Sequence, residues 1–396
     1  MSDQALSKLR VIDLTHYMAG PYCTKLMAGF GAEVIKIEPP KTGDKMRGIG
    51  PFFEDREGPD RSIPFLWLNT GKKSLTLNLK SREGADLLKT MVKDADVVVE
   101  NFSPRVLQGL GLDYPALKKI NPRLVMASIS NFGQTGPYRD FEAEEIEAYA
   151  MCGAMYATGL ADKPPLACGP AVSQYSAAMS AYFGVLMALF ARKTSGKGQH
   201  IDVSIMECGI DQVENRVTNY LQLGKGSKRG GHMYSPWGLY SCKDGYTAVI
   251  GAPFRHWTKG AEMFEEPRLL APEYHHVRDR VQHRKEIDAL LQPWLDRHTR
   301  QEIIEAATKR KLAFGSLLTF DEVMASPQHK ARKFFAEINH PVVGRQKYAD
   351  APFKMARTPW ETTRAPLLGE HNKEVLSGLL GLSANDLTRL QAGGVV

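Results

Sequence analysis

The sequence predicts an α/β fold whose first half contains a doubly wound parallel sheet. Apolar runs of strand length alternate with helical segments over about 130 residues, which is the pattern of repeated βαβ units. The first unit reads as LRVIDL, a short helix and EVIKIE. The segment DVVVE at Asp96–Glu100 is apolar on both faces, as in strands that helices cover on both sides.

The elements of this region follow in chain order. Strands are predicted at Leu9–Leu14, Glu33–Glu38, Ser74–Lys80, Asp96–Glu100 and Leu124–Ser130. Helices are predicted at Tyr22–Phe30, from a Ser81 cap to about Ala95, within Asn101–Leu112 and at Tyr114–Ile120. Ligands of such sheets collect at the carboxyl ends of the strands, here near Tyr17–Ala19, Lys80 and Asn101–Arg105. The first turn, THYMAGPY, lacks GxGxxG, which disfavours NAD.

A longer helix is predicted after Gly169. Ser173 is expected to cap it, and it runs to about Arg192, where Gly196 ends it. Two serines and a basic pair interrupt its apolar run, so we interpret it as a buried core helix and not as a membrane span. The alternating residues that follow, up to Ile205, predict a strand.

Gln174 lies in the first turn of this helix. Free backbone N–H groups point outward there and stabilise an anion, so a carboxylate at this position would be a positioned nucleophile. This chain has an amide instead. An acidic helix is predicted just upstream, at Ala143–Ala157, and its first glutamates are typical partners of a helix dipole.

Three domain segments are expected. Residues 1–225 form the first part of a large α/β domain, residues 226–325 a smaller domain, and residues 326–396 a return to the large one. The smaller domain opens with a hairpin, Leu239–Ser241 and Tyr246–Gly251, around the turn signal Lys243–Gly245, and is then mostly helical.

Composition narrows the function classes. The chain has 396 residues and a net charge of +7, but its Lys and Arg residues are scattered, so nucleic-acid binding is not expected. The five cysteines form no CxxC pair, and the histidines show no metal-ligand spacing; we therefore expect reduced thiols, no metal site and a cytoplasmic protein. The N-terminus has no apolar signal region and no membrane association is expected.

Several segments together resemble one enzyme family. They are VIDLTHYMAGPYCTKLMAGFGAEVIKIEPPKTGD, NTGKKSLTLNLKSREG, ENFSPRVLQGLGLDYPALKKINPRLVMASISNFGQTGP, KTSGKGQHIDVSIMECG, KDGYTAVIGAP and TPWETTRAPLLGEHNKEVL, with the closing LQAGGVV. In this order they are similar to the class III CoA-transferases, the CaiB/BaiF-type family III enzymes. The resemblance extends over almost the whole chain.

The resemblance implies an architecture and a substrate. A Rossmann-like large domain would form from both chain ends, beside a small α+β domain, and two chains would thread through each other as interlocked rings. Coenzyme A or an acyl-CoA would bind along the strand ends as a substrate, with no permanently bound cofactor. By position, Met18 and Ala19 would lie beside the thioester, and Leu77, Lys80, Asn101 and Phe102 at the adenine and phosphate end. Tyr17 is also expected to touch CoA. Arg105 is added as a nearby cation for phosphate.

The family mechanism relies on one aspartate that forms an anhydride and then a thioester with CoA. Counting back without gaps from Gly198–Gln199 places that aspartate at Gln174, and an amide is not a competent nucleophile. The resemblance is therefore closest to a non-catalytic subunit, as in succinyl-CoA:benzylsuccinate CoA-transferase, with succinyl-CoA as one candidate donor. The related racemases need the same aspartate and are disfavoured, and the segment RGGHMYSPWG is bulkier than the glycine-rich flap of many family members.

Three hypotheses stay open. In the first, an Asp-bearing paralogous subunit completes a heterodimer or heterotetramer that moves CoA from an acyl-CoA to a carboxylic acid. In the second, a homodimer is active through another carboxylate, for which Glu145 is the best candidate. In the third, the chain is a CoA-binding or assembly protein without turnover.

Overall fold

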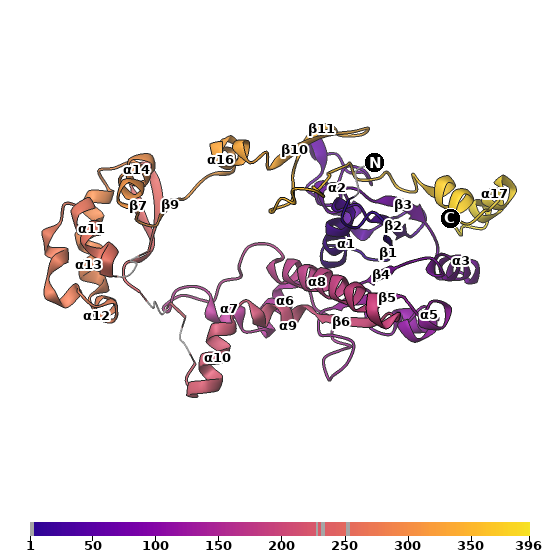
Figure 1. Cartoon of the computed structure of the whole chain (residues 1–396), viewed down its shortest axis with the longest axis horizontal. Helices are drawn as coiled ribbons and strands as arrows, with labels where there is room; N and C mark the ends of the chain where they lie inside the picture. Colours follow the sequence, from indigo (N-terminus) through magenta and orange to yellow (C-terminus); the bar gives the residue numbers. More distant parts are fainter. Residues whose placement is uncertain (1–3, 227–228, 231–233, 251–253) are drawn as a thin grey trace. The chain divides into compact units, whose positions relative to one another are not determined.

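The computed structural model describes residues 4–226, 229–230, 234–250 and 254–396. The chain divides into two compact units (Figure 1): a large unit of Met1–Arg229 and Lys333–Val396, and a small unit of Gly230–Arg332. Both ends of the chain thus belong to the large unit. The boundaries fall a few residues after the expected positions 225/226 and 325/326.

A six-stranded parallel sheet forms the centre of the large unit, in the order β3-β2-β1-β4-β5-β6. Its strands are β1 (Arg10–Asp13), β2 (Glu33–Glu38), β3 (Lys73–Thr76), β4 (Val97–Glu100), β5 (Val125–Ser130) and β6 (His200–Ser204). Val11 pairs with Val34 of β2 on one side and with Val97 of β4 on the other. The strand order therefore reverses between β1 and β4, and this is the point where doubly wound sheets bind ligands.

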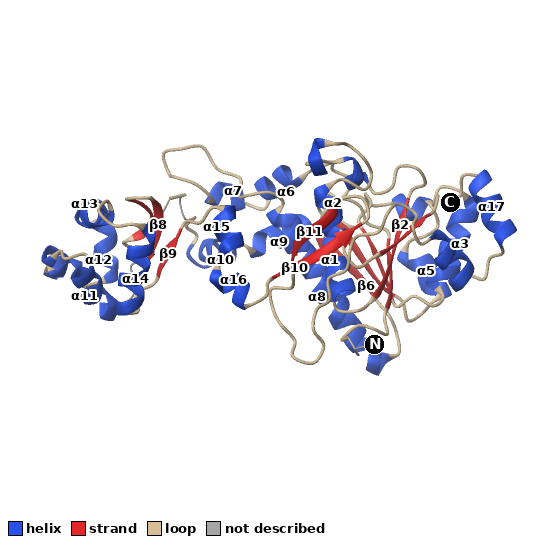
Figure 2. Ribbon diagram, turned by 90° about the horizontal axis from the view of Figure 1, so that it is seen from above, coloured by secondary structure: helices blue, strands red, loops and turns tan. Residues whose placement is uncertain are grey.

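Helices cover both faces of the sheet, as Figure 2 shows. On one face α1 (Ala19–Gly29) and α8 (Val172–Ser195) pack on alternate strand residues such as Val11 and Val99. On the other face α3 (Arg82–Val92), α5 (Tyr114–Ile120), η5 (Glu374–Leu379) and α17 (Ala384–Ala392) pack on residues such as Ile12 and Val98. The parallel α/β class is confirmed, because all six strands pair in parallel and helices cover both faces of the sheet.

The remaining elements of the large unit are short. They are η1 (Lys45–Gly48), η2 (Phe53–Asp55), α2 (Ile63–Leu68), α4 (Val106–Gly109), α6 (Glu145–Met151), α7 (Ala154–Ala157), α9 (Ile205–Asp211), α10 (Glu214–Leu223), β10 (Phe335–His340) and β11 (Gly344–Ala349). The acidic helix expected at Ala143–Ala157 is therefore two helices. Gly153, with φ of 83°, separates them, a backbone conformation that glycine adopts at little cost.

The observed starts and ends of α3 and α8 can be compared with the capping residues that the sequence predicts. Ser81 caps α3 as predicted, accepting from the N–H of Gly84, and Gly196 ends α8 with φ of 68°. The Ser173 cap is wrong: the N-cap is Ala171, and Ser173 lies inside the first turn with its hydroxyl buried and unpartnered. The reason is that another side chain, Glu145, satisfies the N–H groups that a capping hydroxyl would take.

Helix α8 is the one helix in the described part of the chain that is long and apolar enough to cross a membrane. Its small residues Ala177, Ala181 and Ala188 are fully buried against α1 and β5. These contacts account for its apolar composition as that of a core helix.

The small unit has its own core. Its elements are β7 (Trp237–Cys242), β8 (Gly245–Ile250), β9 (Phe314–Ser316), α11 (Phe254–Met263), η3 (Pro267–Leu270), η4 (Pro272–Tyr274), α12 (Val277–Gln282), α13 (Arg284–Leu295), α14 (Arg300–Arg310), α15 (Phe320–Ala325) and α16 (Pro327–Ala331). Strands β7 and β8 form the predicted hairpin, and Gly251 lies outside the described residues, as does most of the segment RGGHM.

Candidate CoA site

A cavity of about 880 Å³ opens at the carboxyl ends of the strands, beside the reversal of strand order. Leu77, Lys80 and Phe102, three of the residues expected to contact CoA, line it. The turn after β2 adds Pro39 to Thr42, and the chain end adds residues such as Gln391. The cavity therefore combines an apolar floor with polar and basic edges, as a nucleotide-like ligand requires.

Lys41 is a lining residue that the sequence did not suggest. It follows the carboxyl end of β2, next to the point where the strand order reverses, and that position was the available signal. Lys41 and Lys80 are both exposed at the cavity edge. Each could hold an anionic group such as a phosphate.

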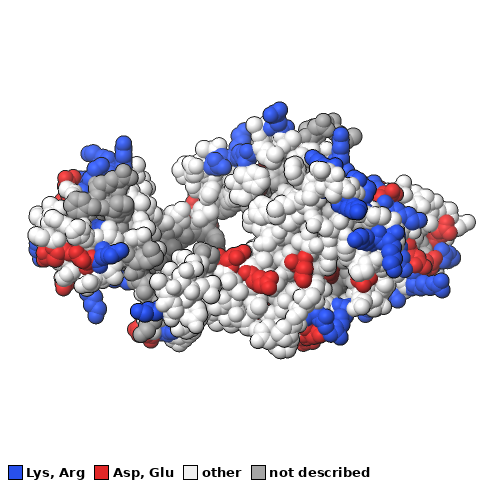
Figure 3. All heavy atoms as spheres, turned by 60° about the horizontal axis from the view of Figure 1, so that its bottom comes forward, with Lys and Arg blue, Asp and Glu red and all other residues white. Residues whose placement is uncertain are grey.

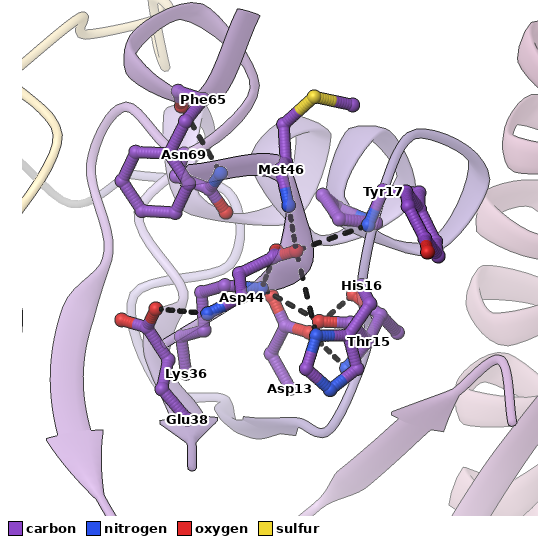
Figure 4. Close-up of polar contacts among 12 residues, drawn as sticks. Asp13, Thr15, His16, Tyr17, Lys36, Glu38, Asp44, Met46, Phe65 and Asn69 are labelled. Carbon is purple, nitrogen blue, oxygen red and sulfur yellow. Dashed lines mark hydrogen bonds and ion pairs between the residues drawn. The ribbon is translucent and has the colours of Figure 1, made fainter. Parts of the chain in front are cut away.

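The turn between β1 and α1 is held by buried charges (Figure 4). The carboxylate of Asp44 accepts the N–H groups of Tyr17 at 3.1 Å and Met46 at 2.9 Å, and pairs with Lys36 at 2.8 Å. The Lys36 amine also donates to the carbonyl of Thr15 at 2.7 Å. Asp44 and Lys36 are fully buried, so these bonds are shielded from water and fix the turn.

A second buried pair, Asp13 and Lys72, lies beneath the same turn at 2.9 Å. Burial alone would raise the pKa of Asp13, but Lys36 and Lys72 hold that pKa well below its usual range. Burial also lowers the pKa of Lys72 to about 8, against the opposing attraction of Asp13. The acid is therefore an anion at neutral pH, and it anchors β1 to the segment before β3.

Asn101 fixes the turn from the side of β4. Its Oδ1 accepts the N–H of His16 at 2.8 Å, and its Nδ2 donates to the carbonyl of His16 at 2.7 Å. Asn101 itself does not line the cavity, whereas its neighbours His16 and Phe102 do. Its role here is to position those two residues.

Tyr17, Met18 and Ala19 follow His16 directly and lead into α1. Tyr17 has φ of 64° and is 38% exposed, Met18 is half-buried and Ala19 is buried. Like Asn101, these three residues are not among those that line the cavity. Arg105 does not line it either, and its guanidinium pairs with Asp140 at 2.7 Å.

The start of α8 holds the second part of the site. The Glu145 carboxylate accepts the N–H of Ser173 at 2.9 Å and that of Gln174 at 3.2 Å. An anion thus occupies the first turn of α8, but it comes from α6 and not from position 174. The charge-assisted bonds and the dipole of a 24-residue helix both stabilise it.

Three aromatic side chains connect the two parts of the site. Tyr22 lies one turn after Met18 on α1, and its ring is 5.0 Å from that of Tyr175, the residue after Gln174. The Trp67 ring stacks on Tyr22 at 5.5 Å, and the Lys25 amine lies 3.9 Å from the centre of the Trp67 ring. These half-buried rings form a wall between the β1–α1 turn and the start of α8.

No group of three or more His, Cys, Asp or Glu residues suited to a metal occurs among the described residues.

Comparison with known proteins identifies the family. The profile of CoA-transferase family III matches residues 6–372. The chain is 34% identical to the succinyl-CoA–D-citramalate CoA-transferase of Chloroflexus aurantiacus, over 99% of this chain and 98% of that one. It is 33% identical to the formyl-CoA:oxalate CoA-transferase of Streptomyces coelicolor over the whole of both chains.

The chain is also similar to a solved structure of a CAIB/BAIF family protein from Brucella suis. The TM-score is 0.85 and the sequence identity 30%, over 96% of this chain and all of that one. The chain belongs to CoA-transferase family III. Its substrates are therefore CoA thioesters, and no permanently bound cofactor is required.

The cavity yields a first prediction. Lys80→Ala and Lys41→Ala should each weaken CoA binding by roughly 1–3 kcal/mol, because each removes a charge-assisted phosphate contact. Arg105→Ala is the matched control: its guanidinium is engaged by Asp140, so CoA affinity should not change. Isothermal calorimetry measures all three. Unchanged CoA affinity in both lysine variants would show that the phosphates of CoA do not bind at this edge of the cavity.

Glu100 yields a second prediction, on pH. It is 4% exposed and accepts the N–H of Phe102 at 2.9 Å, and burial raises its pKa to about 7. An unfolded glutamate has a pKa of about 4.3, so between these values the folded state binds more protons and stability falls as pH rises.

Glu100→Gln removes this titration. From about pH 5 to pH 8 the wild type should lose up to about 3 kcal/mol of unfolding free energy relative to the variant. Urea unfolding of both proteins at each pH measures the difference. Parallel pH dependence of the two proteins would show that Glu100 titrates normally.

Proposed function

We propose that this chain is the non-catalytic subunit of a heteromeric family III CoA-transferase, which moves CoA from an acyl-CoA to a carboxylic acid. The observation that carries the proposal is Gln174, an amide at the position where we place the family nucleophile, in a chain that keeps a cavity suited to CoA at the strand ends. An Asp-bearing paralogous chain supplies the missing carboxylate, in a heterodimer or heterotetramer. Succinyl-CoA, which names one relative, is a candidate donor.

The chemistry explains why Gln174 matters. A carboxylate oxygen attacks the thioester carbonyl, and the C–S bond breaks to give a mixed anhydride and the CoA thiolate. The thiolate then attacks the enzyme's acyl carbon, releasing the first acid and forming an enzyme thioester. The acceptor carboxylate reverses these two steps. An amide oxygen is not an effective nucleophile at neutral pH, so the sequence cannot begin at Gln174.

One observation favours a second candidate, an active homodimer that uses Glu145. Its carboxylate is held at 2.9 and 3.2 Å on the N–H groups of Ser173 and Gln174, so a carboxylate is present beside the position that lost one. The same bonds occupy both of its oxygens and stabilise the anion, which reduces its nucleophilicity. We therefore rank Glu145 second, as a residue that positions the helix start.

Trapping separates the candidates. The pure chain, given acyl-CoA and a labelled acid, should show no exchange and no acyl or CoA adduct after hydroxylamine or borohydride treatment and mass spectrometry. Co-expression with an Asp-bearing paralogue should give exchange. An adduct on Glu145 that Glu145→Gln abolishes and Glu147→Gln retains would establish the second candidate. CoA binding without exchange in any combination would favour a CoA-binding or assembly protein.

We also propose the interlocked assembly of two chains, here with the paralogue as the second chain. Support comes from an apolar stripe on α8: Phe183, Met187 and Phe190 are 51%, 66% and 73% exposed and repeat at helical spacing.

The five cysteines are all free, which supports a reducing compartment such as the cytoplasm.

Disrupting the stripe tests the assembly. Met187→Glu and Phe190→Glu should each convert a two-chain particle into single chains, because a charge would be buried at the interface. Thr194→Glu, an exposed position on the same helix, is the control. Light scattering coupled to size exclusion measures the mass. Two results would contradict a role of the stripe in assembly. One is a wild-type chain that has the mass of a single chain in the presence of its paralogue, and the other is a Glu variant that still has the mass of two chains.

A further inference from the structure

The cavity at the strand ends crosses four neighbouring strands, and the residues that follow these strands differ in chemistry. Lys80 follows β3 and Lys41 follows β2, so both cations lie toward one end of the cavity. His16 follows β1, and Phe102 follows β4. Neighbouring strands lie about 4.8 Å apart, so the ends of β1 and β3 are about 10 Å apart. A ligand that crosses the cavity therefore meets two lysines at one end and an imidazole at the other.

The side chain of His16 is held in one orientation (Figure 4). Asn101 bonds its backbone at both the N–H and the carbonyl. The Phe102 ring packs edge-on against the imidazole, with 5.8 Å between the ring centres. The Nδ1 atom accepts the backbone N–H of Lys45 at 3.3 Å and lies 3.4 Å from the Asp44 carboxylate. The imidazole is thus positioned before any ligand arrives, which lowers the entropic cost of binding.

The contacts of Nδ1 decide where the imidazole proton lies. Because Nδ1 accepts the Lys45 N–H, the proton of a neutral ring is on Nε2. A proton on Nδ1 would be directed at Asp44, which already accepts two backbone N–H groups and pairs with the Lys36 amine. The Nε2 atom makes no hydrogen bond with any described residue, and the ring lines the cavity. His16 therefore offers an uncharged N–H donor to a ligand.

Two buried carboxylates lie close to His16 or line the cavity with it, and both are compensated. Asp44 pairs with Lys36 at 2.8 Å, and Glu38 pairs with Arg47 at 2.6 Å. All four side chains are almost completely buried, so their charges cancel in pairs over a short distance. These pairs leave no net charge that would draw a phosphate to the imidazole.

The cations of the cavity lie at its other end, where Lys41 and Lys80 follow β2 and β3. Figure 3 shows further basic side chains over the end of the large unit that carries α17, and Gln391 of that helix lines the same cavity. Lys45 is directed elsewhere: its amine lies 5.4 Å from the centre of the Tyr17 ring, and it is not a lining residue. Phosphates are therefore expected at the β2–β3 end, and an uncharged polar group beside His16.

We propose that His16 is a CoA-binding residue whose Nε2–H donates to an amide carbonyl of the pantetheine arm. Coenzyme A has its phosphates at one end, amide groups in the arm and a thiol at the far end, and this order matches the order of groups along the cavity. It also agrees with the thioester position expected at Met18 and Ala19, just beyond His16 on the same turn. The inference rests on the CoA site of the proposed function and is independent of whether Gln174 is inert.

Two variants separate a contact with the ligand from a purely structural role. The carboxamide of asparagine reaches the place of Nδ1, and that of glutamine the place of Nε2. His16→Asn keeps an acceptor for the Lys45 N–H but loses the donor to the cavity, so CoA should bind about tenfold more weakly. His16→Gln keeps the donor and should bind CoA within about twofold of the wild type. The reverse order of affinities would overturn the proposal, because it would show that the ring acts only by fixing the turn.

Fragments of CoA identify the group that His16 contacts. Calorimetry on the full chain compares CoA, phosphopantetheine and the adenosine bisphosphate half of CoA. His16→Asn should weaken CoA and phosphopantetheine by the same factor and leave adenosine bisphosphate unchanged. His276→Asn, an exposed position of the small unit, makes the same substitution and should alter none of the three affinities.

The remaining outcomes are distinguishable. If His16→Asn weakens adenosine bisphosphate, the donor contacts a phosphate or the whole cavity is disturbed, and the assignment to the pantetheine arm is wrong. If the wild type binds none of the three ligands, the CoA site itself is rejected, and the role of His16 with it. These measurements involve no CoA transfer, so none of their results bears on the non-catalytic role proposed from Gln174.

Discussion

The buried ion pairs beneath the first turn are the constraint on which the rest of the site depends. Asp44 with Lys36, and Asp13 with Lys72, bring four charges into a region that water does not reach. Removing one member of such a pair typically costs about 3–5 kcal/mol, because its partner is left buried and unpaired. Here the same charges bond the backbone of the turn, so they fix the start of α1 and the edge of the cavity together.

A second constraint acts at the start of α8. The N–H groups at the start of α8 require an acceptor, and Glu145 supplies it from a different helix. This leaves Gln174 as a neutral group beside a carboxylate whose two oxygens each accept one N–H group of α8. The helix start therefore keeps a carboxylate, which comes from α6, while position 174, where we propose the family nucleophile, holds an amide.

The cavity also shows why the expected residues took different roles. Leu77, Lys80 and Phe102 line the cavity, because each lies just beyond the carboxyl end of a strand on the side of the reversal. Asn101 also follows the carboxyl end of a strand, but its side chain is turned toward His16. Its Oδ1 accepts the backbone N–H of His16, and its Nδ2 donates to the backbone carbonyl of the same residue. Arg105 is drawn away by Asp140, a residue distant in sequence that no local pattern could have connected to it.

The sequence by itself determined the parallel sheet, the Ser81 cap of α3 and the glycine that ends α8, because apolar periodicity and capping residues act over a few neighbours. It also determined that position 174 is an amide. Only the tertiary structure decided that Glu145 would cap α8 in place of Ser173, and that Tyr22 would meet Tyr175. Those contacts join segments far apart in the chain, so they depend on packing between helices and not on any local propensity.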